Sequence, residues 1–540
     1  MPTRPVEDFD ALVVGAGFAG LYALHRLHGA GLRVRVLERL DGIGGTWYAN
    51  RYPGARCDVD SLEYSFTFSP ELDQEWDWSE RFASQPEILA YLEHVAERFD
   101  LRRDIDLETT VRAATWDAEL HRWQLETDDG RRLAARFCLM ATGVLSRPLD
   151  PPFRGLEGYC GDWYLTGAFP PEGVDFTGKR VAVVGTGSSA VQAVPKIAAE
   201  AAELTVFQRT ATFAIPGRNR PLGPAELAAK RAVYPRHREE QRHSSFGFSS
   251  DLAPSPTSAL SLPVTDARAE LQRRWELGGA APIMQAFSDV MLAPEANEIV
   301  ADFVRDKIRE IVVDPEVAEL LCPKGYPIAA KRLCVENGYY EAFNRDNVSL
   351  IDAGAAPIEA ITEAGIRQGG SEREFDAIVF AVGFDAVTGA LGDLDIRGRD
   401  GVRLRDAWDG GPRTYLGLTV AGFPNLFTIN GPGSPSVLAI VPVAAEQHVD
   451  WIAECIERMA TAGLVEIEAT EDAQRGWTAH VAEVAEMTLF PRADSYYVGA
   501  NVPGKPRVML PYLGGFSVYR DRCDEVAAND YEGFELRRGG

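Results

Sequence analysis

Three glycines near the N-terminus have the spacing of a loop that binds the phosphates of a dinucleotide. They are Gly15, Gly17 and Gly20. The loop follows an apolar run at 9–14 and opens a helical pattern at 21–27, so a helix N-terminus would supply free N–H groups to a pyrophosphate. Glu38 closes the next strand-like run, 33–38, where a carboxylate can accept ribose hydroxyls. The triplet alone would also suit an ordinary turn; strand, helix and acid in register favour a nucleotide site.

A second glycine loop repeats this arrangement after the strand-like run 180–184. Its candidate nucleotide-binding residues are Gly185, Thr186, Gly187, Ser188 and Ser189. The following strand-like run ends at Arg209, next to Thr210, rather than at an acid. A guanidinium suits a 2′-phosphate, so this loop predicts NADPH rather than NADH. The alternative is that Arg209 is a solvated surface charge.

Two such strand–helix–strand units predict an α/β fold with two Rossmann-like dinucleotide-binding domains. We assign FAD to the first unit, because an acid closes it, and NADPH to the second. Residues 215–324 are rich in Ala, Arg, Glu and Leu and predict a helical insertion that caps the substrate. The apolar runs 377–384 and 425–430 are expected to complete the first sheet. A long helix is expected at about 442–462, and the tail 529–540 is expected to fray.

The domain organisation follows from these units. We expect an FAD-binding domain over 1–147 and 381–540, an NADP-binding domain over 148–214 and 325–380, and the helical insertion between them at 215–324. The segments Ala141–Thr142–Gly143 and Ala381–Val382–Gly383 fit a chain that returns to the flavin domain.

Bulk composition restricts the possible partners and location. The chain has 540 residues and a formal net charge of −25, which disfavours nucleic acid and anionic lipid as partners. Its seven cysteines show no CxxC spacing, so we expect reduced thiols, no metal site and a cytoplasmic location. No apolar stretch approaches the roughly 20 residues of a membrane helix. We expect a soluble monomer or small homo-oligomer.

Residues 44–58, GGTWYANRYPGARCD, match in full one of the two fingerprints of the type I Baeyer–Villiger monooxygenases, and the chain resembles that family along nearly its whole length. Further similar stretches are 331–332, 338–340, 344–347, 430–436, 446–448 and 499–507. The resemblance implies an enzyme that consumes NADPH and O2. It would insert one oxygen atom next to a ketone carbonyl through a flavin peroxide, giving an ester or lactone.

The resemblance also implies roles for particular residues. Arg332 matches the active-site arginine, which stays cationic at any working pH and stabilises the anionic peroxide. Asp58 matches the carboxylate that orients it; the alternative is a turn or cap residue. Lys331 joins Arg209 as a candidate for the 2′-phosphate, and Gln192 matches an NADP-domain position that could equally be ordinary helix packing. The residues expected around FAD are Gly45, Thr46, Trp47, Tyr52, Asp58 and Tyr64, although aromatic residues are more often plain core.

The second family fingerprint, FxGxxxHxxxW, is altered in this chain. Tyr159, Leu165 and Phe169 stand where the family has Phe, His and Trp, and Tyr496 stands in place of the Trp of a Ser-Trp-Tyr motif. The fingerprint lies in the linker between the two domains. Leucine cannot make the hydrogen bond of an imidazole, so we expect an active enzyme that couples NADPH oxidation poorly to oxygenation. The alternative is a repacked linker that works equally well.

Other functions remain open. The same flavin chemistry could oxygenate sulfur or nitrogen, or the protein could act as a poorly coupled NADPH oxidase-like flavoprotein. A nucleotide-sensing protein without turnover is a third alternative. The intact Asp58 and Lys331–Arg332 argue against it.

Overall fold

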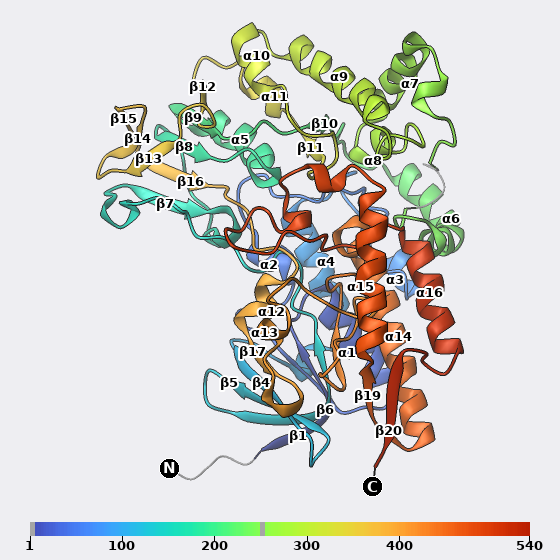
Figure 1. Cartoon of the computed structure of the whole chain (residues 1–540). Coiled ribbons are helices and arrows are strands. Elements are labelled where there is room, and N and C mark those ends of the chain that lie inside the picture. Colours follow the sequence, from blue (N-terminus) through green and yellow to red (C-terminus); the bar gives the residue numbers. More distant parts are fainter. Residues whose placement is uncertain (1–5, 249–253, 540) are drawn as a thin grey trace.

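The computed structural model describes residues 6–248 and 254–539, and it contains a mixed sheet and a parallel sheet that each carry one glycine loop (Figure 1). The first sheet has the order β17-β4-β5-β6-β1-β2-β3, with β18 paired to β6. Its strands are β1 (Glu7–Val14), β2 (Val34–Leu37), β3 (Ile105–Asp106), β4 (Val111–Asp117), β5 (Arg122–Thr127), β6 (Arg132–Met140), β17 (Asp395–Arg397) and β18 (Leu426–Thr428). The second half of the central strand β1, residues 11–14, is apolar and largely buried because helices cover the sheet there.

Helices α1 and α14 lie together on the first sheet. α1 (Phe18–Gly29) follows the first glycine loop, and α14 (Val441–Ala462) returns from the far end of the chain. Tyr22 donates a 2.8 Å hydrogen bond to Asp450 between them. The other helices around this unit are α2 (Thr46–Ala49), α3 (Pro70–Glu75), α4 (Gln85–Arg98), α12 (Gly389–Asp393), α13 (Leu404–Ala407), α15 (Glu471–Glu486) and α16 (Phe516–Ala528). The expected long helix at 442–462 is confirmed.

The second sheet is parallel throughout, in the order β12-β9-β8-β16-β7. Its strands are β7 (Asp162–Leu165), β8 (Arg180–Val184), β9 (Glu203–Gln208), β12 (Val348–Asp352) and β16 (Ala377–Phe380). Helix α5 (Ser188–Glu200) opens at the second glycine loop, and α11 (Tyr339–Ala342) packs on it. An antiparallel flap of β13 (Ile358–Ile361), β14 (Gly365–Gln368) and β15 (Ser371–Glu374) is attached to this unit. The α/β fold with two Rossmann-like units is confirmed.

Two expectations about strands are wrong. The run 377–384 does not complete the first sheet, because β16 pairs with β8 and β7 in the second. The tail does not fray, because β20 (Phe534–Arg538) pairs with β19 (Leu464–Ala469). The run 425–430 behaves as expected, since β18 pairs with β6 of the first sheet. The five domain boundaries stay a prediction.

The insertion is helical but does not form one body. Its helices are α6 (Pro224–His243), α7 (Val264–Leu277), α8 (Ala280–Met284), α9 (Pro294–Ile311) and α10 (Pro315–Leu321). Leu271 and Val304 join the core beneath the second sheet, whereas Tyr234 of α6 joins the core of the first unit. Figure 1 shows α6 beside α3 and α16, separate from α9 and α10. The short strands β10 (Ala214–Pro216) and β11 (Cys334–Glu336) pair with each other where the insertion leaves and rejoins the chain.

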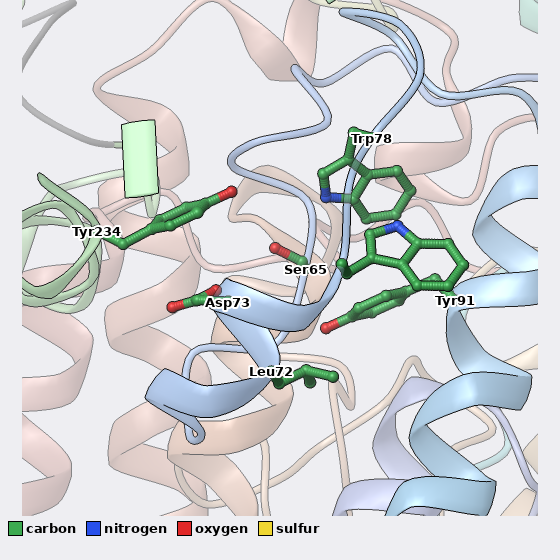
Figure 2. Close-up of a pocket in the computed structure, with 7 residues that line it drawn as sticks. Ser65, Leu72, Asp73, Trp78, Tyr91 and Tyr234 are labelled. Carbon is green, nitrogen blue, oxygen red and sulfur yellow. The ribbon is translucent and has the colours of Figure 1, made fainter. Parts of the chain in front are cut away.

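A buried ion pair fixes α6 to the first unit. Arg238 and Asp73 are 2.6 Å apart, with side chains only 4% and 7% exposed, and Arg238 also donates to Ser65. Figure 2 shows Asp73, Ser65 and Tyr234 around a narrow crevice with aromatic walls from Trp78. The crevice is lined by Ser65, Leu72, Asp73, Trp76, Trp78, Tyr91 and Tyr234. Removing either partner of a buried pair leaves an uncompensated charge, so the pair selects this position of α6 over others.

In the described part of the chain, no helix is both long enough and apolar enough to cross a membrane. All seven cysteines are free thiols, and all but Cys160 are buried.

Candidate active site

The backbone around the first glycine loop is packed so closely that only glycine fits at Gly15 and Gly20. Gly15 has φ +106°, and a Cβ there would lie 2.5 Å from the carbonyl oxygen of Ala141. A Cβ on Gly20 would lie 1.8 Å from the Gly15 carbonyl oxygen. Gly17 ends the loop at the N-terminus of α1, whose first N–H groups receive no side-chain cap. These N–H groups fit the pyrophosphate of a dinucleotide.

Glu38 lies directly behind this loop. Its Oε2 accepts a 2.7 Å bond from the Ala16 N–H, and its Oε1 accepts a 3.0 Å bond from the Leu40 N–H. Burial raises the pKa of this carboxyl, while the two backbone hydrogen bonds act in the opposite direction. Each carboxylate oxygen has two acceptor positions, so both can still accept a ribose hydroxyl. The residue expected to close the first nucleotide site is therefore in place.

The 44–58 loop packs backbone to backbone against the first glycine loop. Gly45 has φ +55°, and a Cβ there would lie 2.9 Å from Gly17 Cα. Thr46 begins α2, and Trp47 Nε1 donates a 3.2 Å bond to the Tyr64 hydroxyl. Gly45 thus lies against the first loop, and Trp47 and Tyr64 are fixed to each other. Trp47 is also part of the apolar core, as the alternative reading held.

The second glycine loop repeats this geometry, but a ligand has more space next to its backbone. Gly185 has φ +114°, and a Cβ there would lie 2.4 Å from the Ala381 carbonyl oxygen, just as Gly15 faces Ala141. Ala381–Gly383 therefore lies against the second loop and not in the flavin unit. A Cβ on Gly187 would meet nothing within 4 Å, so space for a ligand lies before α5. Thr186 Oγ1 donates a 2.7 Å bond to the Thr210 carbonyl and holds the loop to the end of β9.

Two cations meet beside this loop. Arg209 is exposed directly after β9, and Lys331 Nζ lies 4.8 Å above the centre of the Tyr326 ring. Burial and the nearby Arg209 charge lower the pKa of Lys331, with Asp494 opposing them. Neither cation forms an ion pair with a carboxylate of residues 6–248 or 254–539. Such a pair of like charges fits a phosphate dianion placed between them.

Arg332 and Asp58 form a bidentate ion pair where the two units meet. Arg332 Nε lies 2.8 Å from Asp58 Oδ2, and Nη2 lies 2.6 Å from Oδ1. Their side chains are 31% and 22% exposed, so the pair is reachable from outside. Burial alone would lower the pKa of Arg332, but Asp58 raises it well above its ordinary value. The guanidinium is thus a fixed cation held in one plane.

Comparison with known proteins places these features in a family. Residues 12–220 match the family model described as pyridine nucleotide-disulphide oxidoreductase. The chain is 41% identical over 529 residues to the acetone monooxygenase (methyl acetate-forming) of Gordonia sp. strain TY-5, covering 98% of this chain and 99% of that one. It is 41% identical to a Baeyer–Villiger monooxygenase of Pseudooceanicola batsensis, with coverage of 97% and 95%. It is 40% identical to the phenazine N-monooxygenase PhzNO1 of Lysobacter antibioticus, with coverage of 98% and 97%.

The chain belongs to the type I Baeyer–Villiger monooxygenase family. Solved structures agree: an oxidized steroid monooxygenase bound to NADP has 49% identity, a TM-score of 0.94, and coverage of 98% of this chain and 100% of that one. OTEMO in complex with FAD and NADP has 39% identity, a TM-score of 0.94, and coverage of 98% and 99%.

The intact Baeyer–Villiger fingerprint also joins the two units. A Cβ on Gly54, which has φ +80°, would lie 2.4 Å from the Gln192 carbonyl oxygen on α5. The Gln192 side chain accepts from Tyr52 Oη at 2.8 Å and donates to the Arg56 carbonyl at 3.0 Å. At the start of the same helix, Ser188 Oγ lies 3.3 Å from the sulfur of Cys334, and Ser189 hydrogen-bonds to Tyr52. Gln192 thus connects the units.

The altered fingerprint lies in the second sheet. Leu165 ends the edge strand β7, where it pairs with Phe380 and packs on the apolar cluster that includes Val184. Phe169 is buried against Tyr164. The expectation that Leu165 lies in a linker between the units is therefore wrong in its placement, because β7 is part of the second unit. Its effect on coupling stays a prediction.

Three neighbours of Arg332 were not among the expected site residues. The Val437 carbonyl accepts a 3.2 Å bond from Arg332 Nη1. Tyr496 and Tyr497 lie within electrostatic range of Arg332, with ring centres 4.4 Å apart. The departure at Ser495–Tyr496–Tyr497 was the signal in the sequence, but only the folded loop brings these rings to Arg332.

Proposed function

We propose that this chain is an FAD-dependent, NADPH-consuming monooxygenase that inserts one atom of O2 next to a ketone carbonyl to give an ester or lactone. The single observation that carries the proposal is the Arg332–Asp58 pair, a fixed cation at the junction of two nucleotide-binding units. Family membership supports the same reaction.

The residues divide between the two cofactors by position. For FAD we propose Gly15, Gly17, Gly20, Glu38, Gly45, Thr46, Trp47, Asp58 and Tyr64. For NADPH we propose Gly185, Thr186, Gly187, Ser188, Ser189, Gln192, Arg209, Thr210, Lys331 and Arg332. Free N–H groups at a helix N-terminus support a dinucleotide at each loop. Glu38 in the first unit and Arg209 in the second support the division between the two cofactors.

Arg332 is proposed as the electrostatic centre of catalysis. FAD, when bound, supplies the hydride acceptor and the oxygen-activating chemistry. Asp58 and the Val437 carbonyl take three of the five N–H groups of the guanidinium, which leaves two to face reacting oxygen atoms. Because Asp58 fixes the plane of the guanidinium, Arg332 needs no reorganisation to stabilise negative charge on those atoms. Asp58 acts by holding this orientation.

The decisive experiment is product analysis with labelled oxygen. FAD-loaded protein is given NADPH, 18O2 and a panel of cyclic, linear and aryl ketones, and products are identified by mass spectrometry. We expect an ester or lactone that carries one labelled oxygen atom. Release of all consumed O2 as hydrogen peroxide with every ketone would overturn the proposal.

Oxygenation of nitrogen is a second candidate. The likeness to the phenazine N-monooxygenase is almost as great as the likeness to the acetone monooxygenase. Adding a thioether and an aromatic N-heterocycle to the panel separates the two: a sulfoxide or N-oxide formed faster than any ester would favour this second function.

The setting of the reaction is also proposed. A ketone and O2 are the small-molecule substrates, and the free thiols support a reducing, cytoplasmic location. We propose a monomer or small homo-oligomer, which light scattering of the purified protein measures directly.

A further inference from the structure

Two chain segments connect the sheets of the two units, and they run antiparallel to each other. One leads from β6 to β7, and the other leads from β16 to β17. Leu149 N–H donates to the Gly383 carbonyl at 3.0 Å, and Asp385 N–H donates to the Arg147 carbonyl at 2.9 Å. The two segments therefore form a short hydrogen-bonded ribbon, which we call the crossing ribbon (residues 144–149 and 383–387).

A charged cluster lies on the crossing ribbon. The Asp385 carboxylate accepts from Arg147 Nη1 at 3.0 Å on the ribbon itself and from Lys505 Nζ at 2.6 Å. The side chains of Asp385 and Lys505 are only 12% and 13% exposed. Lys505 Nζ also donates to the Ala386 carbonyl at 3.2 Å, and Asn501 Nδ2 donates to the Phe384 carbonyl at 2.7 Å. The loop that contains Lys505 is thus bonded to the ribbon by side chains at two positions.

The same loop reaches Arg332. Tyr496 packs on an apolar cluster with Ala386, Val387 and Leu510, of which the first two belong to the crossing ribbon. Leu510 N–H donates to the Tyr497 carbonyl at 2.8 Å, which joins the two sides of the loop. Direct contacts therefore run from the crossing ribbon to the loop, and the loop places the Tyr496 and Tyr497 rings within electrostatic range of Arg332.

We propose that Asp385 and Lys505 are positioning residues whose ion pair fastens the loop of residues 495–510 to the crossing ribbon. The orientation of the two units and the placement of Tyr496 and Tyr497 beside Arg332 are then set together. An ion pair of this kind contributes little net stability but selects one arrangement over others, because a misplaced loop leaves a shielded charge without its partner. The catalytic consequence rests on the proposed function; the mechanical link does not.

The link is tested by hydrogen–deuterium exchange on the FAD-loaded full chain. Lys505→Met leaves Asp385 paired with Arg147, so no carboxylate loses all its partners. Asp385→Asn removes the charge that faces the shielded Lys505 ammonium but keeps an amide oxygen that can accept from it, and Arg147 stays paired with Asp393. We expect at least about tenfold faster exchange of the amides of residues 495–510 in each variant, because exchange follows the opening equilibrium. Peptides from β1 and α14 are expected to exchange as in the wild type, which reports an intact fold.

Two matched variants separate positioning from general loss of charge. Lys505→Arg keeps the ion pair and is expected to restore slow exchange. Asp393→Asn removes the exposed carboxylate 2.8 Å from Arg147 and leaves Asp385 in place, so exchange is expected to stay at the wild-type rate. The double variant Lys505→Met with Asp385→Asn is expected to match either single variant within about twofold, since both remove the same contact.

Kinetics give a second readout. Lys505→Met is expected to raise the KM for NADPH and the peroxide released per NADPH by more than it lowers kcat. Wild-type exchange in the loop of Lys505→Met, or equal loop exchange in Lys505→Met and Asp393→Asn, would overturn the proposal. If the wild type forms no oxygenated product while the exchange results hold, the proposed function fails and the mechanical link stands.

Discussion

At the scale of single residues, Arg332 depends on a planar contact that no other side chain can make. A lysine would keep the charge but lose the bidentate pairing with Asp58. We expect Arg332→Ala to bind FAD normally and to lose about 10²–10³ in the rate of oxygenated product. Arg332→Lys should recover only part of that rate, and Asp58→Ala should weaken the same step. Flavin absorbance and product analysis check these outcomes; wild-type product formation by Arg332→Ala would show that the reaction occurs elsewhere.

Arg209 and Lys331 are the residues expected to discriminate NADPH from NADH. Each can form a charge-assisted contact with a 2′-phosphate worth roughly 1.5–3 kcal/mol. Arg209→Ala is expected to reduce the preference for NADPH over NADH about ten- to a hundredfold, mainly through the KM for NADPH. Lys324→Ala is the matched control, because that lysine is 66% exposed and pairs with Glu319. An unchanged preference in Arg209→Ala would assign the discrimination to other groups.

Residues in local motifs could be read from the sequence. Gly15, Gly185 and Glu38 owe their positions to a strand, a turn and a helix that are adjacent in the chain. Tyr497 and the Val437 carbonyl could not be read in this way. They reach Arg332 across more than a hundred residues of sequence, and they depend on loop backbone that follows no simple period.

At the scale of elements, the sequence indicated which segments are strands but not which sheet each would join. β16 is apolar on both faces, and such a strand suits the interior of either sheet. Its membership is decided by hydrogen bonds to β8 and β7, which leave no trace in its composition. The tail was expected to fray for a related reason. Its strand β20 is mostly polar because it lies in a small two-stranded sheet with β19, and its composition therefore does not mark it as a strand.

The edge strand β7 carries the prediction about coupling. Leu165 packs on the second sheet and cannot hydrogen-bond to backbone, whereas a histidine there could. A hydrogen bond worth about 0.5–1.5 kcal/mol can shift a balance of orientations about tenfold. We expect the wild type to release part of its reducing equivalents as peroxide and Leu165→His to release less, measured as peroxide per NADPH.

Restoring the last fingerprint position together with Leu165→His carries a cost in stability, because that position is Phe169. It is buried, so adding Phe169→Trp should lower the free energy of unfolding by about 1–3 kcal/mol through overpacking, which is measured as a lower melting temperature. Tight coupling in the wild type, with loss in the variants, would instead mean that the altered fingerprint is a complete replacement.

Helix α14 introduces a pH dependence of stability. Burial raises the pKa of Glu446 to about 7, although the Thr67 hydroxyl and N–H, Arg238 and Arg242 oppose the shift. The folded protein therefore holds this proton more tightly than the unfolded chain, and stability falls as pH rises from about 4.5 to about 7. Glu446→Gln removes the effect. The free energy of unfolding that this variant gains over the wild type is expected to be larger at pH 8 than at pH 5, by up to about 3 kcal/mol, and is measured through the difference in melting temperature. The control Glu471→Gln, on the exposed start of α15, should show no such trend.

At the scale of the whole molecule, cofactor content should govern stability. We expect a yellow protein whose FAD is released by acid or heat, because the site holds FAD by N–H groups and Glu38 without a covalent link. A ligand at about a hundred times its Kd adds about 2.7 kcal/mol, so stripping FAD should lower the melting temperature and adding FAD should restore it. A colourless protein that takes up no FAD would contradict the assignment of the first unit.

The crossing ribbon has a consequence for the order in which the enzyme is made. All five strands of the second sheet lie between residues 162 and 380, and the ends of this stretch meet where Leu149 bonds to Gly383. The first sheet, begun at residue 7, waits for β17, β18 and finally α14. Domains generally fold as units while the ribosome extends the chain from its N-terminus. We therefore expect the second unit to complete its fold before the first, although synthesis of the first unit begins earlier.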